Sequence, residues 1–373
     1  MKYKNYKLEE LATIKYGKNQ KKVISDNGHI PIYGTGGLMG YATEALYDKP
    51  SVLIGRKGTI EKVRYVTHPF WTVDTLFYTI IQDNIVLPHY LYYLMSLLDL
   101  KKFNEGTTIP SLRTETLNRI EFNVPELEYQ SKVLSILEPI EEKIDTNNLI
   151  NKNLEAQIDS LYTELFIRSA NPKWKLGTVA DLGTVIGGST PSKKVDAYYT
   201  DHGIAWITPK DLSLDRSKFF YHGETDITNL GLSNSSATIM PPGTVLFSSR
   251  APIGYIAIAA NELCTNQGFK SVVPKKTIGT AFVYCFLKAN LPTIENMASG
   301  STFKEVSGSI MKSVPATIPD QESISHFNDF AKPRILEQKN LEAENRSLAT
   351  IRDSLLPRLM SGELDISKIA LSC

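Results

Sequence analysis

An internal duplication constrains the fold of this sequence more than any other feature. The segment YKLEELATI from Tyr6 resembles WKLGTVADL from Trp174, an offset of 168 residues that places Ala12 over Ala180. EGTTIP from Glu105 resembles SGSTFK, which follows 194 residues later. Similar matches recur in the same order along both halves, and a long fixed period is the signature of repeated structural units. We therefore expect two related modules.

A further match lies in the middle of each half. SVLIGRKGTI from Ser51 resembles TVLFSSRAPIG from Thr244, and both are apolar, strand-like runs that lead into an arginine beside small or turn-forming residues. We expect Arg56 and Arg250 to occupy equivalent positions in the two modules.

The offset changes near the end of each half. Pro139 and Pro333 are 194 residues apart, whereas the string NLEA at Asn153 returns at Asn340 after 187 residues. The difference is seven residues, one heptad. An insertion or deletion of a heptad within a helix preserves which side chains face a packing partner.

The two modules, residues 1–125 and 171–319, combine strand and helix patterns. Short β-type runs are interrupted by Gly, Pro, Asn and Asp, as is typical of strands joined by turns. An amphipathic stretch, HYLYYLMSLL from His89 and AFVYCFLKAN from Ala281, closes each β-rich part. Each module is therefore predicted to be mixed α/β.

A long helix is predicted after each module, in residues 126–170 and 320–373. In both segments apolar residues recur at alternating three- and four-residue steps, which is the pattern of a coiled coil. The first stripe contains Leu137, Ile140, Ile144, Asn147, Asn151, Leu154, Ile158, Leu161 and Leu165. The second and weaker stripe contains Phe327, Ala331, Leu341, Asn345, Leu348, Ile351 and Leu355.

These helices are expected to pair antiparallel, because the first runs from one module to the other and the second returns. The alternative is that each stripe packs only on its own module. Asn147 and Asn151 on the stripe lower stability but specify register. Pro139 and Pro333 predict that each helix starts or kinks at its proline. From Pro139 to Arg168 is about 30 residues, or ~45 Å of helix, which exceeds the ~34 Å turn of B-DNA.

Charge alternates along the chain although the whole carries only +1. Residues 1–125 hold 16 Lys and Arg against 12 Asp and Glu, and residues 171–319 hold 14 against 10. The helical segments are acidic, with 4 against 9 in residues 126–170 and 7 against 9 in residues 320–373. Ordinary surface scatter explains such excesses too, but basic modules favour a polyanionic partner such as nucleic acid.

Several classes of protein are disfavoured. Cys264, Cys285 and Cys373 form no CxxC pair and have no neighbouring His at metal-ligand spacing, which argues against a zinc finger or a disulfide framework. The first residues do not resemble a signal peptide, and no apolar run is long enough to span a bilayer. These features predict a cytoplasmic protein.

Several strings, in this order around two helices, resemble the specificity subunits of type I restriction-modification enzymes. They are WKLGTVADLGTVIGGSTPSKK, IAWITPKDLS, LFSSRAPIGYIAIA, TNQGFKSVVP, SGSTFKEVSGSIMKSVP and LPRLMSGELDI. The first module carries a variant, IPIYGTGGLMGY with VLIGRKGTI, which also resembles a target-recognition domain of that family. The resemblance covers nearly the whole chain.

The resemblance implies an α+β fold with a pseudo-twofold internal repeat. Residues 1–125 and 171–319 are then tandem target-recognition domains, and residues 126–170 and 320–373 are the conserved helices, packed as an antiparallel coiled coil. Each domain recognises one half of a bipartite DNA site, and the helices set the spacer and dock two modification subunits. The chain itself is not an enzyme and binds no cofactor. S-adenosylmethionine belongs to the modification subunits, and ATP and Mg to the restriction subunits. A related type II restriction-methylation system is the alternative within this class.

Residues that contact DNA are expected in small, donor-rich loops with basic side chains, because phosphate contacts position a protein while base-edge contacts specify the sequence. In the first module the candidates are Lys18, Lys21, Lys22, Arg56, Lys57, Thr107, Thr108 and Arg113. In the second they are Ser189, Thr190, Lys193, Lys194, Lys210, Arg250, Gln267, Ser301, Thr302 and Lys304. Helix pairing is assigned to Leu137, Ile144, Asn151, Leu154, Ile158, Leu161, Leu341, Asn345, Leu348 and Leu355.

Each of these assignments has a structural alternative. A lysine is as readily a solvated surface charge, and Arg56 or Arg250 can anchor the fold instead of gripping guanine or phosphate. Gln267 either recognises adenine or satisfies the backbone of the TNQG turn.

Two rival functions come from other classes. A nucleotide-dependent enzyme is suggested by Gly34, Gly36, Gly37 and Gly40, but GTGGLMG does not fit GxGxxG and no good amphipathic helix follows it. A coiled-coil scaffold without DNA explains the helices and the duplication but not the basic excess in the modules. Salt-dependent DNA binding separates the DNA-binding hypothesis from both rivals.

Overall fold

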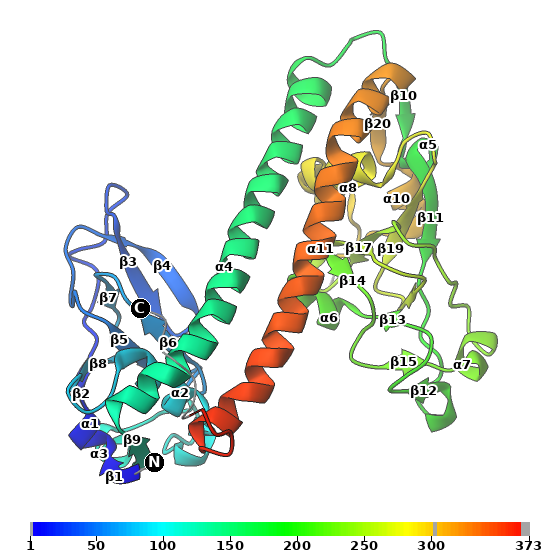
Figure 1. Ribbon diagram of the computed structural model, residues 1–373. Coiled ribbons are helices and arrows are strands. Elements are labelled where there is room, and N and C mark those ends of the chain that lie inside the picture. Colours follow the sequence, from blue (N-terminus) through cyan, green and yellow to red (C-terminus); the bar gives the residue numbers. More distant parts are fainter. Residues whose placement is uncertain (1–2, 301–303, 367–373) are drawn as a thin grey trace. The chain divides into compact units, whose positions relative to one another are not determined.

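The computed structural model describes residues 3–300 and 304–366 and combines helices with seven small sheets. By internal contacts the chain divides into two compact units, Met1–Ile144 with Ser347–Cys373, and Asp145–Arg346. Each unit therefore contains one module and one part of each long helix (Figure 1). This fold is α+β with two tandem modules, as the sequence predicts; the boundaries of the four predicted segments stay a prediction.

In the first unit a four-stranded sheet of order β2-β8-β5-β6 lies with a three-stranded sheet, β4-β3-β7, and a β1-β9 pair. The strands are β1 (Tyr3–Lys7), β2 (Ala12–Tyr16), β3 (Ile30–Gly34), β4 (Gly37–Ala42), β5 (Ser51–Gly55), β6 (Val63–Val66), β7 (Trp71–Thr72), β8 (Leu76–Ile81) and β9 (Glu121–Pro125). The helices of the module are α1 (Leu8–Leu11), α2 (Pro88–Ser96), the 3-10 turn η1 (Leu100–Phe103) and α3 (Thr114–Asn118).

In the second unit a five-stranded sheet of order β11-β19-β16-β17-β14 is accompanied by three two-stranded pairs. The strands are β10 (Lys175–Thr178), β11 (Gly183–Gly187), β12 (Tyr199–Thr200), β13 (Trp206–Ile207), β14 (Phe219–Phe220), β15 (Asp226–Ile227), β16 (Val245–Ser249), β17 (Ile253–Ala259), β18 (Cys264–Thr265), β19 (Lys270–Pro274) and β20 (Pro315–Ile318). The helices are α5 (Val179–Leu182), η3 (Asp196–Tyr198), α6 (Pro209–Leu214), α7 (Asn229–Ser233), α8 (Thr280–Ala289), α9 (Leu291–Met297) and α10 (Gly308–Ser313).

The duplication extends to individual backbone hydrogen bonds. The amide of Leu8 donates to the carbonyl of Ile120 at 2.8 Å, and the amide of Val179 donates to the carbonyl of Val314 at 3.0 Å. Helices α1 and α5 both begin with a capping box, a reciprocal pair of side-chain bonds that satisfies amides at a helix start. The two modules are therefore built on the same hydrogen-bonding plan.

These bonds correct the first offset, which is 171 residues and not 168. Under the predicted alignment Leu8 falls on Leu176, yet Leu8 is fully buried and Leu176 is 81% exposed. The true counterpart of Leu8 is Val179, which is also buried, so Ala12 does not correspond to Ala180. The shared Lys-Leu string lies in a short edge pair, whose side chains are not required by the core.

The predicted equivalence of Arg56 and Arg250 is also wrong, by one residue. The amide of Arg56 donates to the carbonyl of Thr75 at 2.8 Å, and its counterpart is the amide of Ser249, which donates to the carbonyl of Gly268 at 2.7 Å. Arg250 therefore matches Lys57. Hydrogen bonding, not the charged residue, defines the register of these loops.

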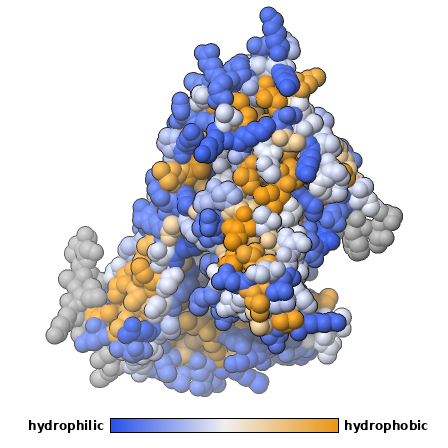
Figure 2. Space-filling view, turned by 90° about the vertical axis from the view of Figure 1, so that its right-hand side faces the viewer, coloured by the Kyte–Doolittle hydropathy of each residue, from blue (hydrophilic) through white to orange (hydrophobic). Residues whose placement is uncertain are grey.

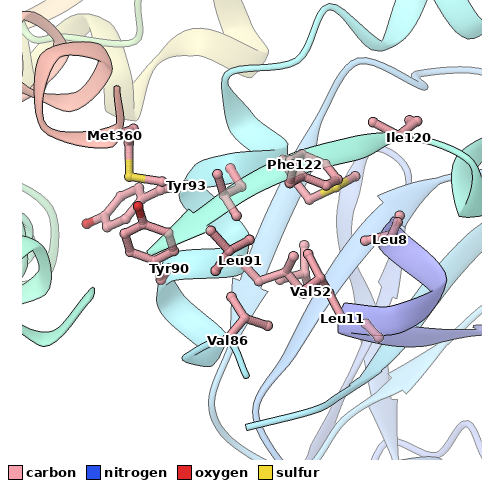
Figure 3. Close-up of a cluster of buried hydrophobic side chains, with 14 of the residues drawn as sticks. Leu8, Leu11, Val52, Val86, Tyr90, Leu91, Tyr93, Ile120, Phe122 and Met360 are labelled. Atoms are coloured by element: carbon pink, nitrogen blue, oxygen red, sulfur yellow. The ribbon is translucent and has the colours of Figure 1, made fainter. Parts of the chain in front are cut away.

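The core of the first module lies between α1, α2 and the sheet that contains β5. Figure 3 shows Leu8 and Leu11 of α1 beside Val52, with Tyr90 and Tyr93 of α2 close to Met360. All of these side chains are nearly or fully removed from solvent. A fully buried aromatic or leucine side chain contributes roughly 1.5–3 kcal/mol through its apolar area. Met360 ends the second long helix, so the end of that helix belongs to the core of the first module.

The two long helices are α4 (Leu127–Thr163), followed by a π-helical turn η2 (Glu164–Arg168), and α11 (Gln321–Met360). Both continue through their prolines, Pro139 and Pro333. The prediction that each helix starts at its proline is therefore wrong. Buried neighbours such as Leu137 and Ala331 pack on both sides of the missing hydrogen bond and offset its cost.

The long helices pair antiparallel within each unit. In the second unit Asn147 bonds Asn345 at 2.8 Å and Gln157 bonds Arg334 at 2.9 Å, so partner numbers fall along α11 as they rise along α4. In the first unit the Tyr129 hydroxyl donates to the carbonyl of Leu359 at 3.2 Å. Buried residues on α4 recur at steps of three and four, as the predicted stripe requires.

Candidate nucleic-acid interface

In the second unit several candidate residues follow strands whose ends are tied together by backbone bonds. The amide of Ser189, after β11, donates to the carbonyl of Thr265 at 2.9 Å, and the amide of Asn266, after β18, donates to the carbonyl of Ile207 at 2.9 Å. Gly188 has no space for a side chain, because an added Cβ would lie 1.9 Å from the carbonyl oxygen of Asn266. The sequence therefore places these loops at defined positions on the sheet.

A tryptophan holds the first of these loops in each module. The Trp206 indole donates to the carbonyl of Ser189 at 3.0 Å, and the Trp71 indole donates to the carbonyl of Lys18 at 2.8 Å. Ser189 and Lys18 are counterparts at the offset of 171. The two tryptophans lie on different strands of the parallel pairs β13-β18 and β3-β7.

A cavity of about 710 Å³ lies among the loops of the second module. Five of the candidate DNA-binding residues line it: Thr190, Lys193, Lys210, Arg250 and Gln267. Aromatic side chains of Tyr199 and Trp206 line it too. The cavity thus combines cations, amides and aromatic faces, the groups that bind phosphates and base edges.

The candidate cations in this cavity are paired with carboxylates. The Lys210 ammonium lies 2.5 Å from Glu224, and both side chains are mostly exposed. Arg250 lies 3.6 Å from Glu305, which also lies 3.6 Å from Lys270. A hydrogen bond and ion pair with Glu224 raise the pKa of Lys210. Exposed pairs of this kind are weak and exchange readily for other anions.

Gln267 has a different role from the one expected in the TNQG turn. The side-chain oxygen of Asn266 accepts the amide of Gly268 at 2.8 Å, so Asn266 satisfies that turn. Gln267 accepts a hydrogen bond from the Thr190 hydroxyl, which joins two of the candidate loops.

In the first unit Arg56 is anchored to the fold. Its guanidinium donates to the carbonyl of Asp74 at 2.9 Å and lies over the ring of Tyr16, 5.0 Å from its centroid. The neighbouring Lys57 is exposed and pairs in an isolated bridge with Ser111. This brings the loop at Arg56 beside the loop that contains Thr107, Thr108 and Arg113.

The remaining candidates are distributed less tightly. Lys18, Lys21 and Lys22 are exposed on the segment after β2. Lys194 and Lys304 are exposed but do not line the cavity. Ser301 and Thr302 lie outside the described residues. Whether any of these residues contacts DNA stays a prediction.

Sequence reasoning missed several residues of this surface. Glu305 and Lys270 join Arg250, and Arg64 lies beside the hairpin of β3 and β4 near Gly37. Trp206 was visible in the string IAWITPKDLS but carried no predicted role. Figure 2 shows mostly hydrophilic residues on the displayed face, with hydrophobic patches between them.

The predicted helix-pairing residues differ in burial. Leu137, Ile158 and Leu341 are buried, and the others, Ile144, Asn151, Leu154, Leu161, Asn345, Leu348 and Leu355, are half-buried. Asn147 is fully buried and donates to Glu344 at 2.7 Å as well as to Asn345. Ile351, expected on the same stripe, is 48% exposed and departs from the pattern.

A buried ionic cluster joins the second module to the helices. The Lys218 ammonium lies 2.6 Å from Glu155 of α4 and donates to Gln338 of α11 at 2.8 Å. Lys288 of α8 contacts Glu155 and lies 2.8 Å from Asp159. Burial alone raises the pKa of Glu155, but Lys218 and Lys288 outweigh it and lower that pKa to about 2.

The equivalent place in the first unit contains a histidine. His89 of α2 lies 2.9 Å from Glu138 and 3.1 Å from Glu141, both on α4. Its ring stacks on Tyr65 and Tyr93, with centroids 4.4 Å and 4.6 Å away. Burial lowers the pKa of His89, but the two glutamates outweigh burial and raise it.

The features that suggested rival functions have structural explanations. The glycines of GTGGLMG form the hairpin between β3 and β4, where Gly37 and Gly40 have positive φ angles of 124° and 157°. Burial raises the pKa of the Cys264 and Cys285 thiols to about 12. Among the described residues no group of three or more His, Cys, Asp or Glu side chains is arranged to hold a metal ion. Over the same residues, every helix is too short or too polar to cross a membrane.

Comparisons with known proteins match most of the chain. The family model of the type I restriction modification DNA specificity domain matches residues 1–156 and 171–345, once per half. The MjaIX specificity subunit of Methanocaldococcus jannaschii, a type I restriction enzyme subunit, is 38% identical over 45% of this chain and 41% of that protein. The HindI specificity subunit of Haemophilus influenzae is 23% identical over 79% of this chain and 81% of that protein.

A solved structure shares the fold. The S subunit of a type I restriction-modification system from M. genitalium superposes with a TM-score of 0.62 at 16% identity, over 96% of both chains. The chain thus spans less than half the length of the MjaIX subunit but nearly all of this structure.

Proposed function

Since the chain belongs to the type I restriction-modification DNA specificity family, we propose that it gives a restriction-modification complex its sequence specificity. Each module recognises one half of a bipartite site in double-stranded DNA. The chain carries out recognition and no catalysis, in the cytoplasm where the DNA lies.

The observation that carries this proposal is the repeated loop surface. Both modules hold a cationic, donor-rich set of loops with the same backbone hydrogen bonds and a tryptophan indole at the same loop carbonyl. Two copies of one surface suit two half-sites, because a duplicated fold with different loop residues recognises two different words. The basic excess of both modules supports the same partner.

The helices are proposed to set the unread spacer. Helix length and register determine separation along DNA, and one heptad is about 10 Å of helix, close to three base pairs. Buried Asn147, bonded to Asn345, favours one register over neighbouring ones.

The partners are proposed to be two modification subunits, docked on the acidic helices, and restriction subunits that join them. S-adenosylmethionine would be bound by the modification subunits, and ATP and Mg by the restriction subunits. The chain itself would need no cofactor.

Exchange of residues 1–125 for the corresponding module of another family member tests the proposal. Methylated adenines are mapped in cells that contain the exchanged chain and its modification subunits. We expect one half of the methylated site to change and the other half and the spacer to remain. A change in both halves would contradict independent recognition by the modules.

A further inference from the structure

We propose that one carboxylate in each module, Glu105 in the first and Glu305 in the second, determines sequence discrimination by repelling phosphate until a base donor satisfies it. This inference rests on the proposed function. It begins from a loop that both modules close in the same way.

The loop neck is closed by backbone bonds alone. The amide of Glu105 donates to the carbonyl of Ser111 at 2.9 Å, and the amide of Ser299 donates to the carbonyl of Glu305 at 3.1 Å. At the offset of 194, Ser299 is the counterpart of Glu105 and Glu305 is the counterpart of Ser111. Each module therefore has one glutamate and one serine at the neck, in opposite places.

This exchange shows that neither position requires a carboxylate for folding. A serine occupies each position in the other module, with the same backbone bonding. Yet both modules retain one carboxylate among loops whose other charges are cationic. A negative charge there opposes binding of any DNA backbone, so its presence in both modules calls for a function.

Each carboxylate is held by the cations of its own module. Glu105 accepts a bond from Arg113 at 3.1 Å and one from the Thr116 hydroxyl. Glu305 lies between Arg250 and Lys270, both at 3.6 Å. Both glutamate side chains remain partly exposed, at 31% and 39%. They are fixed in position and still accessible to a ligand.

A carboxylate accepts hydrogen bonds and cannot donate them. On random DNA it faces phosphates and competes with them for its arginine, which weakens binding. On the correct sequence it accepts from the exocyclic amino group of cytosine or adenine, the base-edge donors of the major groove. The carboxylate therefore lowers affinity for random DNA more than affinity for the recognised half-site.

The test uses the full chain with its modification subunits and the variants Glu305→Gln and Glu105→Gln. Two probes are compared over a range of salt concentrations: a random-sequence duplex, and a duplex that carries the site mapped by methylation. We expect each variant to bind random duplex about three- to tenfold more tightly, as removal of one opposing charge predicts. Selection should relax at one cytosine or adenine position, in the second-module half for Glu305→Gln and in the first-module half for Glu105→Gln.

Two further variants serve as controls. Glu305→Ser copies the residue of the first module and should reproduce the effect of Glu305→Gln with the loop neck intact. Glu363→Gln removes a carboxylate that lies 2.8 Å from Arg358 outside both modules, and should leave DNA binding unchanged.

Unchanged affinity for random duplex in Glu305→Gln, or equal relaxation of both halves, would overturn the inference. Absence of salt-dependent DNA binding by the unaltered complex would instead overturn the proposed function on which it rests.

Discussion

The two modules join the long helices at equivalent places but with different chemistry. In the first unit His89 of α2 lies against two carboxylates of α4, and in the second unit Lys288 of α8 does the same. The imidazole titrates near neutral pH, whereas the ammonium group does not. One packing arrangement is therefore pH-sensitive in one copy and insensitive in the other.

The depth of burial also differs. Lys218, which has no charged counterpart in the first junction, is only 8% exposed and is bonded to both helices. Glu342 of α11 accepts the amides of Lys218 and Phe219 at 2.9 and 3.1 Å. Burial raises the pKa of Glu342, and these backbone bonds only partly oppose that rise. The second junction therefore depends on a network in which each member satisfies another.

The largest expected effect concerns a buried amide that each unit carries near the start of a long helix. Gln130 bonds the amide of Leu87 and the carbonyls of Ile85 and Pro125, at 2.7 to 2.9 Å. Asn328 bonds only the carbonyl of Ile278, the counterpart of Ile85, at 2.9 Å. Gln130→Ala leaves three buried backbone groups without that partner and should cost about 4 kcal/mol, against about 1.5 kcal/mol for Asn328→Ala.

Urea denaturation of the full chain measures both values, and hydrogen exchange shows which unit is destabilised. Equal losses in the two variants would mean that the number of bonds to the amide does not determine the difference.

The next effect separates the two ionic junctions. Glu155→Gln leaves Lys218 buried without its closest carboxylate and should lower the free energy of unfolding of the second unit by about 3 kcal/mol. Glu164→Gln, whose partner Arg168 lies 3.9 Å away on an exposed surface, is the matched control and should change stability by less than about 0.5 kcal/mol. A similar small loss in Glu155→Gln would show that Lys218 is solvated in solution.

The overall plan of this molecule was predictable from sequence because it depends on periodicity. The apolar steps that include Leu137 and Ile158 identify α4, and both side chains are buried. The strings that repeat identify two modules. Such patterns depend on local spacing, which a sequence shows directly.

The errors have a common cause, since each concerns a residue whose surroundings come from distant parts of the chain. Leu176 looks like a core residue beside Lys175 but lies in an exposed edge pair. Lys218 looks like a surface charge, yet its partners Glu155 and Gln338 lie 63 and 120 residues away. Pro139 looks like a helix start, but packing on both flanks carries the helix through it. The candidate loops were found by composition, whereas their carboxylate partners required the fold.

The smallest effect tests the pH dependence of the first junction. Because the folded pKa of His89 is raised above its unfolded value, the stability it contributes is fully present below about pH 6.5 and is lost as pH rises through the raised pKa. We expect the free energy of unfolding of the first unit to fall by roughly 1 kcal/mol over that window.

The groups that face His89 fix how this result is interpreted. Glu138 and Glu141 favour its protonated form, Tyr65, Tyr92 and Tyr93 pack around the ring, and Arg352 acts on Glu141. His89→Gln should abolish the pH dependence of the first unit and leave the second unit unchanged. The second unit has the opposite sign: the lowered pKa of Glu155 contributes stability that is lost only as pH falls from about 4.5 toward about 2. Hydrogen exchange of α2 and α8 between pH 6 and pH 9, roughly the window set by the histidine, would separate the two. If α8 loses protection together with α2, the difference in their cations does not govern the junctions.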